Sequence, residues 1–191
     1  MREIDESSLE SSISDRFTFL AEFMGFGESD IKAIHDAAGL LGPLVPQLVD
    51  GVYDKLHEYS STWRHFLVPQ HGYDGEVPEK LGDLTRDHPL IQFRKQHLAR
   101  YLEALVTQPY DLKFLQYIDM VGKIHTSDAG SSAASIPLVQ MNALLGFVAD
   151  VFNATILGAD IPDSTKHSTL RAFSKLLWIQ NDFINRHYRT A

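Results

Sequence analysis

Apolar residues recur at the spacing of an α-helix along most of this chain, and that period constrains the fold class more than any other feature. Between the prolines at 43 and 46 and the histidine at 57, the inward positions are Val45, Leu48, Val49, Val52, Tyr53 and Leu56. No segment shows the strict apolar–polar alternation of a half-buried strand. The sequence therefore predicts an all-α domain of about eight helices.

Turn-forming residues separate the helical segments and set their expected limits. The longer expected helices cover residues 15–24, 31–39, 45–56, 89–105, 137–157 and 164–188, with a further one that ends just after His125. Residues 68–87 contain several Gly, Pro and Asp and should form a long loop with at most one helical turn. Either Ser29 or Asp30 should cap the second of these helices.

Length and composition indicate one folded domain with a polar beginning. We expect residues 1–14, which are rich in Ser and Glu, to be a flexible N-terminal arm, and residues 15–191 to be a single domain. The net charge of −8 argues against nucleic acid or an anionic membrane as partner. The chain has no cysteine, which suits the cytoplasm. No membrane span is expected, because Asp150 interrupts the most hydrophobic region.

Several kinds of functional site lack the residues that they require. The sequence has no Gly-rich loop with a lysine before a helix, no paired Glu-x-x-His motifs and no nucleophile elbow. His65 and His71 lie close together but have no third ligand on a shared helix face. Nucleotide, di-iron and acyl-transfer chemistry are therefore not indicated.

His125 is the residue with the most informative setting. Phe114, Tyr117, Ile118 and Val121 form the apolar stripe of an amphipathic helix, and His125 continues that stripe just before the helix ends. A histidine placed in this way, followed by the pliable stretch of residues 126–135, can present one ring nitrogen to a flat apolar cofactor. The alternative is a partly buried histidine bonded to a carbonyl.

Tyr53 and His97 lie on the inward stripes of two other helices and can converge with His125 on one cavity. Haem suits this set, because a neutral imidazole can bind iron through one nitrogen while its other N–H donates to a carbonyl such as that of Val121. Tyr53 would then donate a hydrogen bond to a gas on the opposite side of the ring. The alternatives are a core tyrosine and a buried histidine without a ligand role.

Short segments in a characteristic order carry a resemblance to a known family. Residues 49–56 (VDGVYDKL), 109–111 (PYD) and 121–125 (VGKIH) resemble the protoglobins and the sensor domains of globin-coupled sensors, and the likeness extends from Phe17 to Tyr188. In those families a glycine three residues before a histidine marks the proximal haem ligand, which corresponds to Gly122 and His125. Tyr53 matches the distal tyrosine of many members, and Tyr101 and residues 173–180 also look similar.

The resemblance implies a globin-like fold of the protoglobin type with an extra N-terminal helix. It further implies haem b bound by His125, reversible binding of O₂, CO or NO, and a homodimer formed by the last two long helices. Two apolar faces on the helix at 137–157 independently suggest that a partner covers one of them. The expected cofactor-binding residues are His125, Tyr53, His97, Leu98, Tyr101 and Val121, with His125 as the metal ligand.

The chain departs from the family at two places, and two other functions compete. Leu98, beside His97, stands where protoglobins tend to carry an aromatic residue, and Thr126, Ser127 and Asp128 replace the basic residues that follow the proximal histidine. One alternative is a haem-free globin-like signalling or interaction module. The other is a haem enzyme, a peroxidase or NO dioxygenase, for which His97 is the candidate acid–base group.

Overall fold

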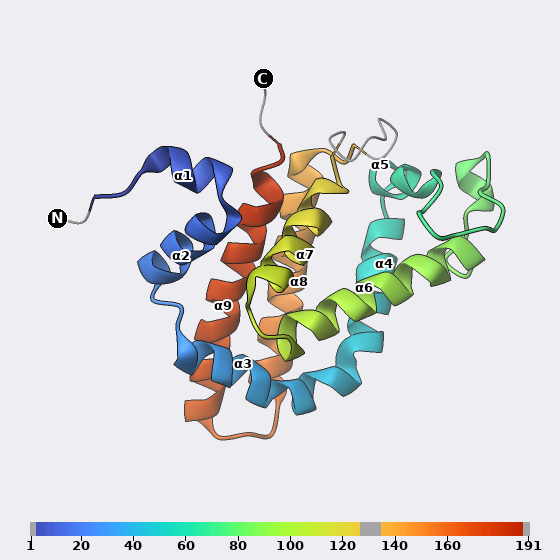
Figure 1. The fold of residues 1–191 in the computed structure, drawn as a ribbon. Helices are drawn as coiled ribbons and strands as arrows, with labels where there is room; N and C mark the ends of the chain where they lie inside the picture. The colour runs from blue at the N-terminus through green and yellow to red at the C-terminus, as the bar shows by residue number, and fades with distance from the viewer. Residues whose placement is uncertain (1–2, 127–134, 189–191) are drawn as a thin grey trace.

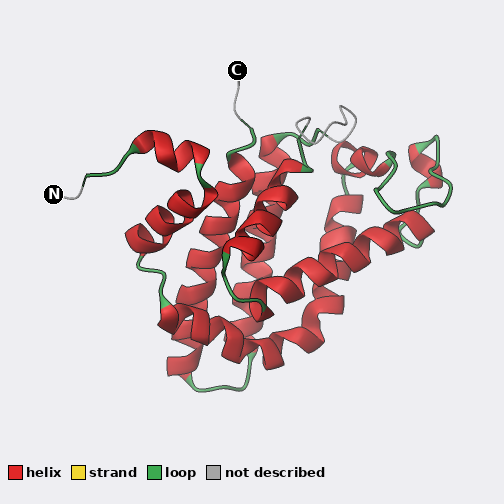
Figure 2. Ribbon diagram, in the orientation of Figure 1, coloured by secondary structure: helices red, strands yellow, loops and turns green. Residues whose placement is uncertain are grey.

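A computed structural model describes residues 3–126 and 135–188, and every regular element within them is helical (Figures 1 and 2). The predicted all-α class is confirmed. The helices are α1 (Glu6–Ser11), α2 (Ile13–Met24), α3 (Glu28–Leu41), α4 (Val45–His57), α5 (Ser60–Trp63), α6 (Pro89–Thr107), α7 (Leu112–Lys123), α8 (Leu138–Gly158) and α9 (Asp163–Asn185), with 3₁₀ turns η1 (Gly42–Leu44), η2 (Arg64–Phe66) and η3 (Leu81–Asp83).

Local chemistry accounts for most helix limits. Gly25 ends α2 with a left-handed φ of 62°, a conformation that a residue without a Cβ adopts at little cost. The start of α3 differs from the expectation, because the helix begins before the predicted capping residues. Gly27 occupies the N-cap, and the Asp30 side chain reaches back to accept a hydrogen bond from its N–H at 3.1 Å.

The first residues contain a helix where we expected only a solvated arm. Asp5 caps α1 by accepting a hydrogen bond from the Ser7 N–H at 2.9 Å, and no residue of α1 is buried. Two arginines attach this helix to the body of the molecule. Arg16 donates to the Leu9 carbonyl at 3.1 Å, and Arg186 donates to the Glu10 carbonyl at 3.0 Å.

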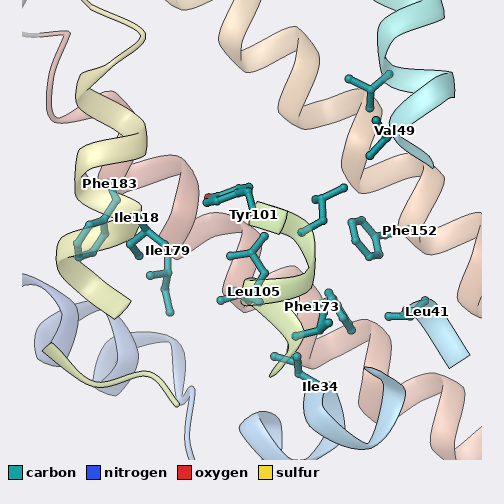
Figure 3. Close-up of a cluster of buried hydrophobic side chains, with 14 of the residues drawn as sticks. Ile34, Leu41, Val49, Tyr101, Leu105, Ile118, Phe152, Phe173, Ile179 and Phe183 are labelled. Atoms are coloured by element: carbon teal, nitrogen blue, oxygen red, sulfur yellow. The ribbon is translucent and has the colours of Figure 1, made fainter. Parts of the chain in front are cut away.

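The core forms around α9, which packs against α3, α7 and α8, while α4 packs against α6 (Figure 1). Figure 3 shows side chains of this cluster, with Ile118 of α7 beside Ile179 and Phe183 of α9. Phe152 of α8 stacks on Phe173 of α9 with ring centroids 5.1 Å apart. This packing fixes where α4, α6 and the end of α7 lie relative to one another.

Helix α8 is apolar but poorly covered. Its 21 residues have a mean hydropathy of 1.4, and 17% of the most apolar window is buried. By length and composition alone it could cross a membrane, which differs from the sequence expectation because one charge, Asp150, does not reduce the average enough. Val139 and Leu157 are 74% and 57% exposed. The second apolar face expected from the sequence is therefore exposed in the monomer.

Candidate functional site

His125 lies in the turn directly after α7, two residues beyond the last helical residue. Its Nδ1 is 2.7 Å from the carbonyl oxygen of Val121. Because a carbonyl only accepts, Nδ1 carries the proton and donates it, which leaves the lone pair on Nε2. Burial lowers the pKa of His125, so the ring is neutral at neutral pH. The structure thus contains the bond to Val121 that the sequence suggested.

The backbone around His125 is also fixed by hydrogen bonds. Its carbonyl oxygen accepts from the Ile136 N–H at 2.9 Å and from the Tyr188 hydroxyl at 3.4 Å. At the other end of α7, Asp111 caps the helix by accepting from the Phe114 N–H at 3.0 Å. The backbone at His125 is therefore fixed, and the bond from Nδ1 to the Val121 carbonyl orients the ring. Most of the adjoining stretch at 126–135, including Ser127 and Asp128, lies outside the described residues.

Gly122 allows α7 to approach α9 closely. A Cβ at this position would lie 2.6 Å from the Phe183 carbonyl oxygen and 3.0 Å from the Ile184 Cα, both of which are backbone atoms that cannot rotate away. One turn earlier, Asp119 accepts from Arg186 at 2.8 Å and lies 3.0 Å from His187 Nε2. The glycine three residues before the histidine thus has a packing reason, independent of any cofactor.

Tyr53 lies on the inward face of α4, where its side chain is buried. Its ring packs against Phe66 with centroids 5.6 Å apart, and the Lys95 ammonium lies 5.8 Å above it. Burial raises the pKa of Tyr53, so the hydroxyl stays protonated and can donate. Among the described residues, this hydroxyl has no hydrogen-bond partner. Tyr53 is therefore a core tyrosine whose donor is unused within the described part of the chain.

On α6 the structure places Leu98 on the inward side, as expected, but not His97. His97 is exposed and lies against Phe93 with ring centroids 4.7 Å apart, so the prediction that it shares a face with the core is wrong. Leu98 is partly buried against the core, and Tyr101 is buried with its hydroxyl unpartnered among the described residues. Successive helical positions are about 100° apart, so an error of one residue moves a side chain to another face.

Sequence reasoning missed Arg94, which lies on the same side of α6 as Leu98 and Tyr101. Its guanidinium is 5.2 Å from the centre of the Phe66 ring, and its Nε is buried without a partner among the described residues. Its charge lowers the pKa of His125 and counteracts the rise in the pKa of Tyr53. Arg94 therefore lies within electrostatic reach of both. The spacing of four to Leu98 and seven to Tyr101 could have indicated it.

The described residues contain no group of three or more His, Asp or Glu that could hold a metal ion by side chains alone. An apolar cleft of about 420 Å³ lies between α4, α6 and α8, lined in part by Leu48, Val106 and Phe147. Neither His125 nor Tyr53 lines it. A planar group between those two residues would therefore occupy a different space.

Two comparisons with known proteins identify the family and the fold. The sequence model of the protoglobin family matches residues 13–191. The chain belongs to the protoglobin family. Among solved structures, it is similar to the globin domain of a Geobacter sulfurreducens globin-coupled sensor, with 16% identity, a TM-score of 0.70, and coverage of 91% of this chain and 97% of that one. No curated protein matches the chain in sequence.

The globin fold expected from the sequence is confirmed by these matches. In a member of the protoglobin family, the residues present suit haem on two structural grounds. The first is a neutral imidazole whose Nε2 carries the lone pair. The second is a set of buried polar groups without partners in the described residues, the Arg94 Nε and the Tyr101 hydroxyl. Burying such groups without compensation is costly, which favours a bound group that satisfies them.

Proposed function

We propose that this protein binds haem b through His125 and reversibly holds a diatomic gas, O₂, CO or NO, on the opposite side of the ring. The hydrogen bond from His125 Nδ1 to Val121 carries the proposal, because it fixes the tautomer that leaves Nε2 available to iron. Membership of the protoglobin family supports it. When bound, haem supplies an iron centre with one axial position for the gas.

Each residue of the proposed site would have its own role in binding haem or the gas. His125 would hold the iron through Nε2, and the Val121 carbonyl would make that imidazole more electron-rich by accepting its other N–H. Tyr53 donates a hydrogen bond from its protonated hydroxyl to the gas. Leu98 and Tyr101, on the buried side of α6, contact the cofactor. His97 is exposed, so its role as a cofactor-binding residue is not part of the proposal.

Absorption spectra of the purified protein, oxidised, reduced and with CO, test the assignment. His125→Ala should lose five-coordinate ferrous haem and its normal CO spectrum, because the axial nitrogen is gone. His97→Ala is the matched control and should leave all three spectra unchanged, since that ring is exposed on α6. Wild-type spectra from His125→Ala, or a wild-type protein with no Soret band after haem reconstitution, would contradict the proposal.

We further propose that two copies pair through α8 and α9 in the cytoplasm. The exposed apolar residues Val139 and Leu157 on α8 and Trp178 on α9, which is 62% exposed, support an interface there. Ala143→Arg places a charge on the exposed face of α8 and should shift the mass measured by light scattering from dimer to monomer. Gln96→Arg, at an exposed position of α6, should not change the mass. A wild-type monomer would contradict the proposal.

The two alternative functions have less support. An enzymatic function would need an acid–base group beside the gas, and the exposed position of His97 gives that reading no support. A haem-free interaction module remains the competing hypothesis, and the absence of a Soret band in the reconstituted wild type is the result that would favour it.

A further inference from the structure

Buried polar atoms without a hydrogen-bond partner mark places where something can bind. Within the described residues these atoms are His65 Nε2, Arg94 Nε, Tyr101 Oη, Gln140 Oε1, Gln180 Oε1 and Asn185 Oδ1. Arg94 differs from the others because it carries a permanent positive charge. An unpaired buried charge is far more costly than an unpaired neutral group, so Arg94 is the feature that most needs an explanation.

Other basic side chains that are mostly buried have a carboxylate partner. Arg16 contacts Asp182, Lys175 contacts Asp30 at 2.9 Å, and Arg186 contacts Asp119 at 2.8 Å, with exposures of 13%, 20% and 13% for the three basic side chains. Arg94 has no carboxylate partner among the described residues. Its only protein acceptor there is the Val68 carbonyl, which receives Nη2–H at 2.8 Å.

The neighbours of Arg94 show where its guanidinium lies. The guanidinium lies 5.2 Å from the Phe66 ring, which in turn contacts the Tyr53 ring at 5.6 Å. Arg94 is therefore close to Tyr53, one of the two residues that define the proposed haem site.

We propose that Arg94 is the anion receptor of this site, where its guanidinium binds a negatively charged group held between α4, α6 and the His125 turn. This inference rests on the proposed function. A guanidinium with a free Nε–H suits a carboxylate or another small anion, because its N–H donors form charge-assisted hydrogen bonds with fixed geometry. The anion has two possible sources: a carboxylate of the porphyrin, or a small inorganic anion bound at ferric iron.

The first arm of the test uses iron-free porphyrin and needs no activity. Protoporphyrin IX and its dimethyl ester are titrated by fluorescence into the apo-forms of the wild type, Arg94→Met and Arg94→Lys. If the porphyrin carboxylate is the anion, the wild type prefers the acid over the ester by about tenfold or more, and Arg94→Met loses that preference. Arg94→Lys keeps the positive charge but not the planar set of N–H donors, so it should retain part of the preference for the acid. Arg100→Met, an exposed arginine on the same helix, is the control.

The second arm uses azide and CO on the haem-loaded protein. If the anion binds at iron, Arg94→Met weakens azide binding to ferric protein by about tenfold and leaves CO binding to ferrous protein unchanged. Loss of the acid-over-ester preference, or weaker azide binding, in Arg94→Met supports the proposal and identifies the source of the anion. An unchanged acid-to-ester ratio together with unchanged azide binding would overturn it, as would an equal loss of acid and ester, which indicates a structural role. A wild type that binds no porphyrin would instead overturn the proposed function, and this inference with it.

Discussion

On the α7–α9 side of the site, the charged side chains are paired and two helix backbones touch, whereas on the α4–α6 side two buried donor atoms, one on an arginine and one on a tyrosine, have no partner among the described residues. Asp119 and Arg186 form the pair on the first side, and Gly122 is the point of contact. The unpartnered donors on the second side are the Arg94 Nε–H and the Tyr101 hydroxyl, while Arg94 Nη2 donates to the Val68 carbonyl. Both sides belong to one core.

This difference suggests a division of roles between the two sides. Paired charges and close backbone contact hold α7 against α9, so this side can keep His125 in place with or without a ligand. The α4–α6 side leaves donors unused, and a bound group that accepts hydrogen bonds would stabilise it. Ligand recognition should therefore depend on α4 and α6, and stability on α7 and α9.

Among the variants that test this difference between the two sides, Gly122→Ala should change stability the most. The added methyl meets the Phe183 carbonyl at 2.6 Å, and such overpacking should lower the free energy of unfolding by about 3 kcal/mol. Gly51→Ala on α4 is the control, because nothing lies within 4 Å of its Cβ position. That change should raise stability by about 0.5–1 kcal/mol. Urea denaturation measures both, and equal effects would contradict the division of roles.

A smaller effect, on binding rather than folding, should follow Tyr53→Phe. Loss of one hydrogen bond to the gas, worth about 1–3 kcal/mol, should speed O₂ dissociation roughly five- to a hundredfold. Stopped-flow displacement of O₂ by CO measures the rate. Tyr59→Phe, which removes an exposed hydroxyl just beyond α4, should leave it unchanged. If Tyr53→Phe also leaves it unchanged, Tyr53 has only a packing role.

Acid should destabilise the α4–α6 side through His65. Burial, helped by the neighbouring Arg64, lowers the pKa of His65 in the folded protein, while the unfolded chain takes up a proton at the ordinary value of about 6.5. Stability is therefore complete above pH 6.5 and is lost as the pH falls through that value towards the lowered pKa. His65→Gln should flatten this loss in urea titrations at several pH values, and His167→Gln, at an exposed position of α9, should not. An equally steep loss in His65→Gln would contradict the assignment.

The smallest effect should come from the exposed ion pair between Arg86 and Asp54, which bridges the loop before α6 and α4 at 2.7 Å. The two side chains are 54% and 52% exposed, so solvent screens the pair and Arg86→Met should change stability by less than about 0.5 kcal/mol. Urea denaturation at low and high salt measures this. A loss above about 1 kcal/mol would show that the α4–α6 side depends on its surface charges after all.

Much of the fold could be predicted because it depends on local pattern. The helices on either side of Gly25 and the bond from His125 to Val121 involve residues within a few positions of each other. Interactions of this range depend on spacing, which the sequence states directly. The helix in residues 6–11 was missed because its anchors, Arg16 and Arg186, lie elsewhere in the chain.

The candidate site was predicted in part. His125 and Tyr53 have the expected surroundings, whereas His97 is exposed and Arg94 was not foreseen. A charged residue on an amphipathic helix is normally solvated, and only the way α6 packs shows that the Arg94 guanidinium is enclosed. A periodic pattern does not define the rotation of a helix to within part of a turn, so it cannot tell which of two neighbouring positions is buried.

By itself, the sequence determined that the chain is helical, where most helices begin and end, and which histidine follows a glycine by three residues. Only the tertiary structure decided which face of α6 is buried, why residue 122 must be glycine, and which enclosed charge has no carboxylate partner among the described residues. The physical reason is range: helix period and capping act between neighbours in the chain, while burial and charge pairing depend on residues that only folding brings together.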